Sequence, residues 1–198
     1  METMVIKPIN LLKVLTYKVK KQDKRKKFHS FTEKNIAIFT DASVSPYGGP
    51  ACIGWVQKGS LETVKFELVK EEPTSVQFLE AKAIARAILK NDTTEKICIY
   101  SDSQVGIRII KTIFSGKNYH EATVLLGTST VNAMVHGNRR KTVQLIWVKA
   151  HQENDWNVIC DQLVRYGRNR LKAGASIEEV NHEAQGVLHE MMRVRELK

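Results

Sequence analysis

The spacing of apolar residues changes along this chain, and that change limits the possible folds more than any other feature. Three short β-rich runs come first, separated by turn residues; they cover residues 35–40, 51–58 and 62–69. In the third run Val64, Phe66 and Leu68 alternate with charged residues, which is typical of a strand with one buried face. From residue 78 onward, long helical patterns alternate with short apolar runs. The chain is therefore expected to form a sheet that is covered by helices.

The order of the later segments predicts the topology of that sheet. We expect helices and strands to alternate as follows: helix 78–90, strand 96–100, helices 103–114 and 119–135, strand 142–148 and helix 154–171. The complete order, β-β-β-α-β-α-α-β-α, joins an antiparallel meander to parallel crossover units. We therefore predict an α/β fold with a five-stranded mixed sheet flanked by helices.

Two helices carry start signals in the sequence. Thr74 and Gln77 have the spacing of a capping pair in front of the first helix, and Ser176 and Glu179 have it again near the C-terminus. The helix that follows Ser176 bears an apolar stripe at helical spacing, so we expect it to pack on the rest of the domain.

Four acidic residues stand at the ends of strands or on helices that follow them: Asp41, Glu80, Asp102 and Asp161. If the first and fourth strands are parallel neighbours, Asp41 and Asp102 reach the same edge of the sheet, where ligand sites of α/β folds collect. Carboxylates brought together repel one another, and burial adds to that cost. Oxygen ligands favour a hard cation such as Mg²⁺ or Mn²⁺. The pattern indicates metal-assisted chemistry on phosphates.

Composition sets the class of protein and its expected compartment. The chain is 42% hydrophobic and 26% charged, which is ordinary for a globular domain. No apolar run approaches the about 20 residues of a membrane span, and the N-terminus lacks the features of a signal peptide. Three scattered cysteines are too few for a disulfide framework. We expect no membrane partner and a reducing intracellular compartment, the cytoplasm or the nucleus.

Positive charge is concentrated at the N-terminus. Residues 1–31 hold nine Lys or Arg and two Asp or Glu, so they carry 9 − 2 = +7 of the total +10. Seven of these cations lie within residues 18–27, which fit a solvated tail, a grip on phosphates or a localisation signal. A short helix over Met4–Leu15 would be interrupted by Pro8. We divide the chain into a basic extension (1–32), a main domain (33–173) and a C-terminal helical extension (174–198).

The four acids sit in short phrases that resemble those of type I ribonuclease H, and the similarity spans about residues 34–172. The phrases are Phe39-Thr40-Asp41-Ala42-Ser43, Glu80 within a long helix, Tyr100-Ser101-Asp102-Ser103-Gln104, and Trp147-Val148-Lys149-Ala150-His151 followed by Asn157 and Asp161. Each phrase alone is weak, and their order and spacing together are specific. They resemble the ribonuclease H domains of retroelement polyproteins more than a compact bacterial enzyme.

The resemblance implies a role for each of these residues. Asp41 would bridge two divalent ions, Glu80 and Asp102 would hold the ion near the leaving group, and Asp161 would hold the ion that activates water. His151 would assist proton transfer or product release. A further set would contact the nucleic acid: Ser43, Gln77, Ser103, Gln104 and Asn157.

The resulting hypothesis is a ribonuclease H that cuts the RNA strand of RNA–DNA hybrids with two Mg²⁺ ions, which Mn²⁺ can replace. One alternative is a DNA-acting nuclease or transposase-like enzyme of the same fold. Another is a hybrid-binding module of a reverse transcriptase that no longer cuts. We expect a monomer, and the sequence leaves open whether the chain stands alone or belongs to a larger polyprotein.

Overall fold

The apolar run at residues 36–39 belongs to a central strand that is buried on both faces. In this strand, β3 (Asn35–Ser43), Ile38 packs into the core on one side, and Ala37 and Phe39 pack into the core on the other. A strand covered on both faces has no polar face, which is why this run shows no alternation in the sequence.

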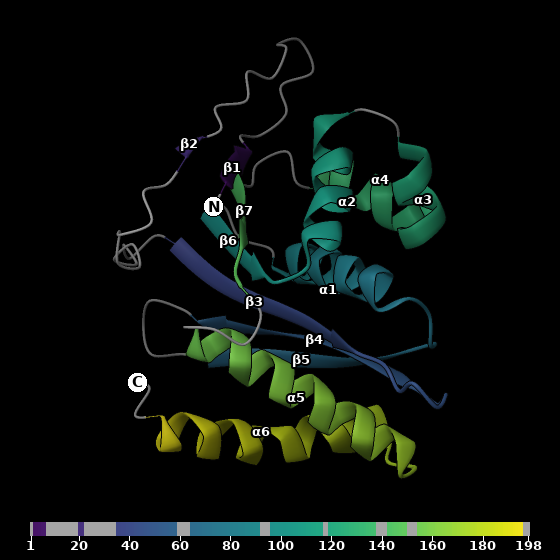
Figure 1. The fold of residues 1–198 in the computed structure, drawn as a ribbon, viewed down its shortest axis with the longest axis vertical. Coiled ribbons are helices and arrows are strands. Elements are labelled where there is room, and N and C mark those ends of the chain that lie inside the picture. The colour runs from purple at the N-terminus through teal and green to yellow at the C-terminus, as the bar shows by residue number, and fades with distance from the viewer. Residues whose placement is uncertain are drawn as a thin grey trace.

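A computed structural model of the chain describes residues 2–6, 20–21, 35–58, 64–91, 96–116, 119–137, 142–149 and 154–195. Within these residues, one sheet has seven strands in the order β2-β1-β7-β6-β3-β4-β5 (Figure 1). Besides β3, the strands are β1 (Glu2–Ile6), β2 (Lys20–Lys21), β4 (Ala51–Lys58), β5 (Val64–Glu71), β6 (Lys96–Ser101) and β7 (Thr142–Trp147).

The predicted five-stranded mixed sheet is confirmed as β3 to β7. β3 pairs antiparallel with β4, where Asp41 lies opposite Gly54, and β4 pairs antiparallel with β5. On its other side β3 pairs parallel with β6, and β6 pairs parallel with β7. The first and fourth predicted strands are therefore parallel neighbours, which is the condition that brings Asp41 and Asp102 to one edge.

Two further strands extend the sheet beyond β7. β1 pairs antiparallel with β7, with Thr3 opposite Ile146, and β2 pairs with β1. The helix expected from Met4 is thus wrong for residues 4–6, and residues 7–15 lie outside the described part of the chain. The free backbone groups along β7 offer hydrogen bonds to an extended partner, and this pairing outweighs the local helical pattern.

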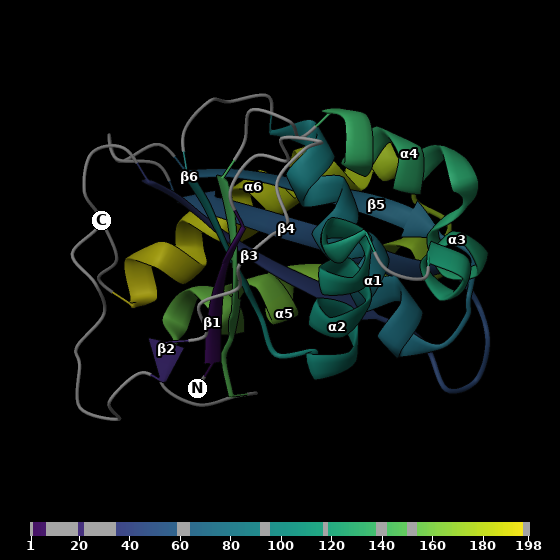
Figure 2. The ribbon, with the colours of Figure 1, turned by 90° about the horizontal axis from the view of Figure 1, so that it is seen from above.

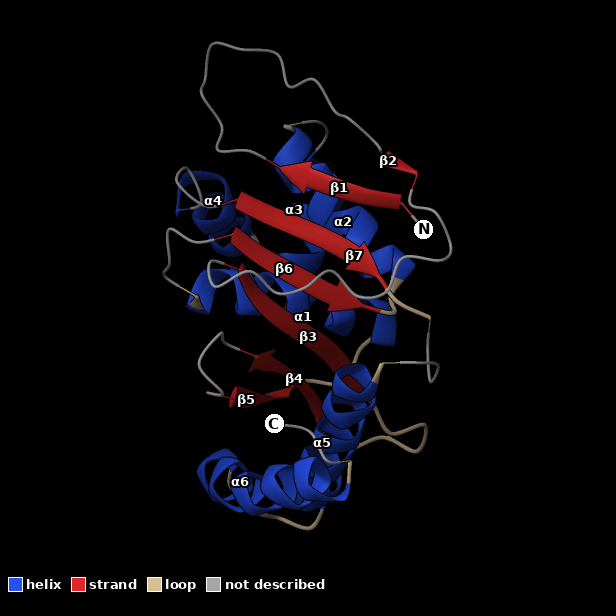
Figure 3. Ribbon diagram, turned by 90° about the vertical axis from the view of Figure 1, so that its left-hand side faces the viewer, coloured by secondary structure: helices blue, strands red, loops and turns tan. Residues whose placement is uncertain are grey.

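Helices cover both faces of the sheet (Figure 2, Figure 3). α1 (Val76–Lys90), α2 (Gln104–Ser115), α3 (Tyr119–Leu126) and α4 (Thr128–Gly137) lie on one face, and α5 (Asp155–Lys172) packs on the other, against β3, β4 and β5. α6 (Ile177–Val194) packs on α5 and β5, as its apolar stripe predicted. No described helix is long and apolar enough to cross a membrane.

Two local predictions need correction. The helix expected over 119–135 is two helices, because Gly127 adopts a left-handed backbone (φ 83°) and ends α3. At the start of α1, Ser75 rather than Thr74 is the N-cap, and its side chain makes no capping hydrogen bond. The second capping box is confirmed: the Ser176 hydroxyl accepts the Glu179 N–H, and the Glu179 carboxylate accepts the Ser176 N–H.

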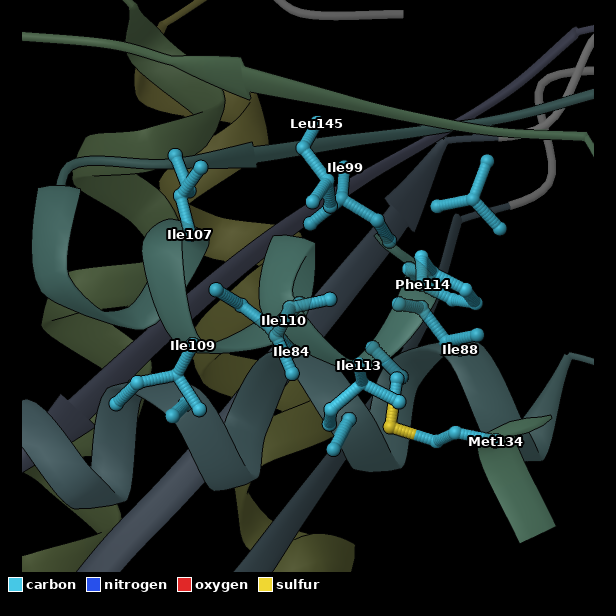
Figure 4. Close-up of a cluster of buried hydrophobic side chains, with 14 of the residues drawn as sticks. Ile84, Ile88, Ile99, Ile107, Ile109, Ile110, Ile113, Phe114, Met134 and Leu145 are labelled. Atoms are coloured by element: carbon cyan, nitrogen blue, oxygen red, sulfur yellow. The ribbon is translucent and has the colours of Figure 1, made fainter. Parts of the chain in front are cut away.

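The larger core lies between the sheet and α1, α2 and α4 (Figure 4). It is built mainly from fully buried isoleucines, which α1 and α2 contribute together with the strands; among them are Ile84, Ile88, Ile99, Ile109, Ile110 and Ile113. Burying one such side chain stabilises the fold by about 1.5–3 kcal/mol. This layer fixes how α1 and α2 lie over β6 and β3.

All three cysteines are buried and unpaired. Cys52 and Cys160 lie in the core between the sheet and α5, and Cys98 lies on β6. The Cys160 thiol donates to the Phe39 carbonyl at 3.3 Å. Burial raises the pKa of Cys52 to about 12 and also raises the pKa values of Cys98 and Cys160. The thiols therefore act as apolar core groups.

Candidate metal centre

Parallel pairing of β3 and β6 brings two carboxylates to the same end of the sheet. Asp41 lies in β3, buried, and its Oδ1 accepts the Ala42 backbone N–H at 2.8 Å. Asp102 directly follows β6, whose Tyr100 pairs with Phe39. Each acid comes from a strand whose apolar residues fix its register, so the carboxylates are placed by the core.

Glu80 reaches this edge from α1, and a close contact between α1 and α2 sets its position. Gly106 in α2 lies so near α1 that a Cβ there would come 3.2 Å from the Ala81 backbone nitrogen. The same Cβ would come 3.1 Å from the hydroxyl of Ser103, which caps α2 by accepting the Gly106 N–H. Because Glu80 precedes Ala81 and Asp102 precedes Ser103, the glycine permits the approach of these two acids.

The three acids form a tight cluster. Asp41, Glu80 and Asp102 each offer a carboxylate oxygen, and these oxygens lie within 4.8 Å of one another. Asp41 and Glu80 are buried, and Glu80 Oε2 has no hydrogen-bond partner. A buried oxygen without a partner is costly unless something binds it.

The electrostatics of the cluster reflect this crowding. Burial raises the pKa of Asp41 to about 7; the hydrogen bond with Glu80 lowers it, and the charge of Asp102 raises it. Burial, followed by the charge of Asp41, raises the pKa of Glu80 well above its usual range. A divalent cation would relieve both effects, since it stabilises the ionised form of each carboxylate. The donor set, oxygens alone, fits Mg²⁺ or Mn²⁺.

Asp161 lies near the cluster but is not one of the three. It sits in the second turn of α5, and its charge raises the pKa of Asp41. Asp161 Oδ1 accepts a hydrogen bond from Arg165 Nε at 2.8 Å. The structure thus brings together three of the four predicted acids, and the fourth forms an ion pair with Arg165.

The other predicted residues occupy different positions. Ser43 ends β3 and is buried, and Gln77 and Gln104 are exposed in the first turns of α1 and α2. Ser103 uses its hydroxyl as the α2 cap. Asn157 is buried near the start of α5, and its Oδ1 has no partner. His151 lies outside the described residues.

Two residues near the acids were not expected from the sequence. The indole Nε1 of Trp147 donates to the Asp102 backbone carbonyl at 3.0 Å, and the Val148 N–H donates to the Ser101 carbonyl at 3.0 Å. These two hydrogen bonds fix the end of β6. The second unexpected residue is Arg165, although its i,i+4 spacing from Asp161 was visible in the sequence. The Trp147 contact spans 45 residues and left no such signal.

These features are those of an α/β domain of nuclease type, with a cluster of acids suited to binding a cation. A family model described as RNase H matches residues 33–169, which are 169 − 33 + 1 = 137 of the 198 residues. The chain therefore belongs to the ribonuclease H family. No curated protein matched the chain in a search for relatives.

Proposed function

We propose that this chain hydrolyses the RNA strand of RNA–DNA hybrids with the help of two Mg²⁺ ions. The observation that carries the proposal is the cluster of Asp41, Glu80 and Asp102, whose oxygens lie within 4.8 Å of one another in a domain of the ribonuclease H family. Mn²⁺ has the same preference for oxygen ligands and should replace Mg²⁺.

In this proposal the four acids share two ions. Asp41 would touch both, Glu80 and Asp102 would complete one site, and Asp161 would complete the other. When bound, the ions supply an activated water near neutral pH and stabilise the leaving oxygen of the phosphodiester. Water attacks the phosphorus, the bond to the 3′-oxygen breaks, and the products carry a 5′-phosphate and a 3′-hydroxyl.

The remaining steps belong to the protein's own side chains. Burial of Asp41 and Glu80 excludes bulk water from one side of the reacting phosphate. His151 would move a proton between the site and solvent, a role for which histidine side chains are suited.

Polar side chains around the acids would select the RNA strand. Ser43, Gln77, Ser103, Gln104 and Asn157 are proposed to contact the backbone and the 2′-hydroxyls across the wide minor groove of the hybrid. Gln77 and Gln104 are exposed at helix starts near Glu80 and Asp102, as this role requires. None of these contacts reads a base, so cleavage should depend little on sequence.

The test is strand-specific cleavage of a labelled hybrid, with a titration of Mg²⁺ and Mn²⁺. The wild-type chain should cut the RNA strand only when a divalent ion is present, and Asp41→Asn should lower the rate by at least about 100-fold, because transition-state charge stabilisation is lost. An intact RNA strand at all metal concentrations would overturn the proposal. Parallel digestion of duplex DNA and duplex RNA measures the selectivity for hybrids.

Several broader assignments stay proposals alongside this one. We assign the catalytic domain to residues 33–173, with a basic extension at 1–32 and a helical extension at 174–198, in a monomer. We place the activity in a reducing compartment, the cytoplasm or nucleus, either free-standing or within a reverse transcriptase polyprotein. Size-exclusion chromatography with light scattering tests the oligomeric state directly.

A further inference from the structure

We propose that Arg165 controls the loading of the second cation site, because its guanidinium is the counter-ion of Asp161 and must give way before a divalent ion binds there. The proposal rests on the proposed function, since it concerns the same four acids. It assigns a positioning residue that acts through Asp161, and it predicts that the two ions bind with unequal affinity.

The geometry of the α5 pair supports this assignment. Arg165 Nε lies 2.8 Å from Asp161 Oδ1, and the two residues are one helical turn apart. The Asp161 side chain is 17% exposed, whereas that of Arg165 is 54% exposed. The Asp161 carboxylate is therefore largely shielded from solvent, while the Arg165 side chain that pairs with it is more exposed.

Asp41 and Glu80 lie in a different electrostatic environment from Asp161. The charges of Asp102 and Asp161 both raise the pKa of Asp41, so Asp41 lies in a negative field. Glu80 keeps a buried oxygen without a partner. A first cation is therefore drawn to the three-acid cluster, where it would meet the unpartnered oxygen of Glu80 and the negative field at Asp41.

A second cation meets a different environment at Asp161. An ion on that carboxylate would lie close to the guanidinium, and like charges a few ångströms apart repel strongly near a protein surface. The ion must also replace a charge-assisted hydrogen bond. The exposed arginine can leave Asp161 by rotation about its own side-chain bonds.

Nucleic acid supplies a reason for the arginine to move. A phosphate group beside α5 offers the guanidinium a planar, bidentate partner of higher charge than one carboxylate. When Arg165 turns to such a phosphate, Asp161 becomes available for the second ion. Loading of the complete metal centre would then follow substrate binding, and the enzyme would hold one ion in its absence.

Calorimetric titration of the full chain with Mn²⁺, without nucleic acid, tests this mechanism. We compare the wild type with Arg165→Gln and Arg165→Lys. In Arg165→Gln the affinity of the weaker Mn²⁺ site should rise by about three- to ten-fold, because the repelling charge is gone. The affinity of the stronger site should stay unchanged. Arg165→Lys keeps the charge and should titrate like the wild type.

Arg193→Gln is the matched control. Arg193 pairs with Glu190 at 2.7 Å, three residues away on the exposed face of α6, so this variant also removes a helical ion pair but leaves the acids untouched. Its titration should equal that of the wild type. Thermal unfolding of all variants checks that each is folded, as expected for changes at exposed arginines.

The outcomes separate the two proposals. If the weaker Mn²⁺ site has the same affinity in Arg165→Gln as in the wild type, the proposed role of Arg165 is overturned. A lower affinity in the variant would also overturn it, because it would mean that the arginine orients Asp161 for the ion. The proposal is also supported if the titration detects one Mn²⁺ binding event in the wild type and two in Arg165→Gln. If the wild type neither binds Mn²⁺ nor cuts a hybrid, the proposed function itself fails.

Discussion

At the scale of single residues, Asp41 and Glu80 show how much of the fold's stability is given up for the site. Both are buried acids, and the pKa of each is raised, first of all by burial. At neutral pH without a cation, ionising them costs free energy that the unfolded chain does not lose. The metal-free protein is therefore expected to be less stable than its core alone would make it.

The first prediction concerns the pH dependence of that stability. The pKa of Asp41 is about 7 in the folded chain, against 3.8 for an unperturbed group, so between these values the folded state holds a proton that the unfolded state has released. This contribution is complete below the lower value and is lost as the pH rises through the higher one. The melting temperature of the metal-free wild type should therefore fall more steeply between about pH 5 and pH 8 than that of Asp41→Asn.

The comparison with Asp41→Asn measures the titration of the Asp41–Glu80 pair, because the substitution removes the Asp41 carboxyl and also the charge that raises the pKa of Glu80. Mg²⁺ added at the higher pH should raise the melting temperature of the wild type and have much less effect on the variant. Circular dichroism at two pH values measures both effects. Parallel pH profiles for the two chains would contradict the prediction.

The second prediction concerns Trp147 as a support for Asp102. Trp147→Phe keeps an aromatic ring at the end of β7 but removes the donor to the Asp102 carbonyl. A hydrogen bond of this kind contributes about 1 kcal/mol, so the affinity for Mn²⁺ should fall by about five-fold. Titration calorimetry measures the change.

Trp55→Phe provides the control for that variant. Trp55 lies in β4, which is two strands from β6, and it is buried in the core. Its replacement should lower stability through lost packing and leave the metal affinity unchanged. Equal effects of the two substitutions on Mn²⁺ affinity would show that Trp147 acts only through global stability.

At the scale of elements, α6 closes an exposed edge of the sheet. Asn181 lies on α6 next to β5, and its side-chain oxygen accepts the Leu68 N–H at 2.8 Å. Its amide nitrogen donates to the Leu68 carbonyl, also at 2.8 Å. One side chain thus supplies the two hydrogen bonds that a neighbouring strand would make with this residue, on a strand that ends the sheet.

The third prediction follows from that contact. Asn181→Ala leaves the Leu68 backbone groups without their partner and should lower the free energy of unfolding by about 1–3 kcal/mol. Gln185→Ala, at an exposed position four residues along the same helix, should change it by no more than about 0.5 kcal/mol. Chemical denaturation measures both values, and an equal effect of the two changes would contradict the role of Asn181.

Elements also show how far the sequence could predict this structure. Periodicity was sufficient for β3 to β7 and for the long helices, because each pattern reflects the burial of a face. It was also sufficient to bring Asp41 and Asp102 to one edge of the sheet once β3 and β6 were assumed to be parallel neighbours, whereas Glu80 was placed with them by the resemblance to the family. Pairing between distant segments left no local signal, so β1 against β7 and Asn181 against Leu68 were not predicted.

At the scale of the whole molecule, the main run of positive charge lies outside the residues that match the family model. The basic run at Lys24, Arg25, Lys26 and Lys27 precedes the residues that match the family model, which begin at residue 33. β1 and β2, which also precede residue 33, belong to the same sheet as the acid cluster. Deleting the N-terminal segment would therefore remove strands as well as charge, so substitution is the cleaner experiment.

The fourth prediction uses that substitution. Replacing these four cations by glutamine should weaken binding to a hybrid and reduce the dependence of affinity on salt, by up to about one unit of logarithmic slope for each cation that contacts a phosphate. A control variant in which each of these lysines becomes arginine and the arginine becomes lysine keeps the charge. It should retain the dependence of affinity on salt. An unchanged slope in the glutamine variant would show that this run does not contact the nucleic acid.

The burial of all three cysteines has a practical consequence for spectroscopy. Thiols react as thiolates, and the pKa values of Cys52, Cys98 and Cys160 are all raised. A cysteine introduced at Tyr47, whose side chain is 91% exposed in the turn after β3, would therefore be labelled far faster than the native ones. A fluorophore or spin label at that position would report on the hairpin beside the acids without any prior removal of cysteines.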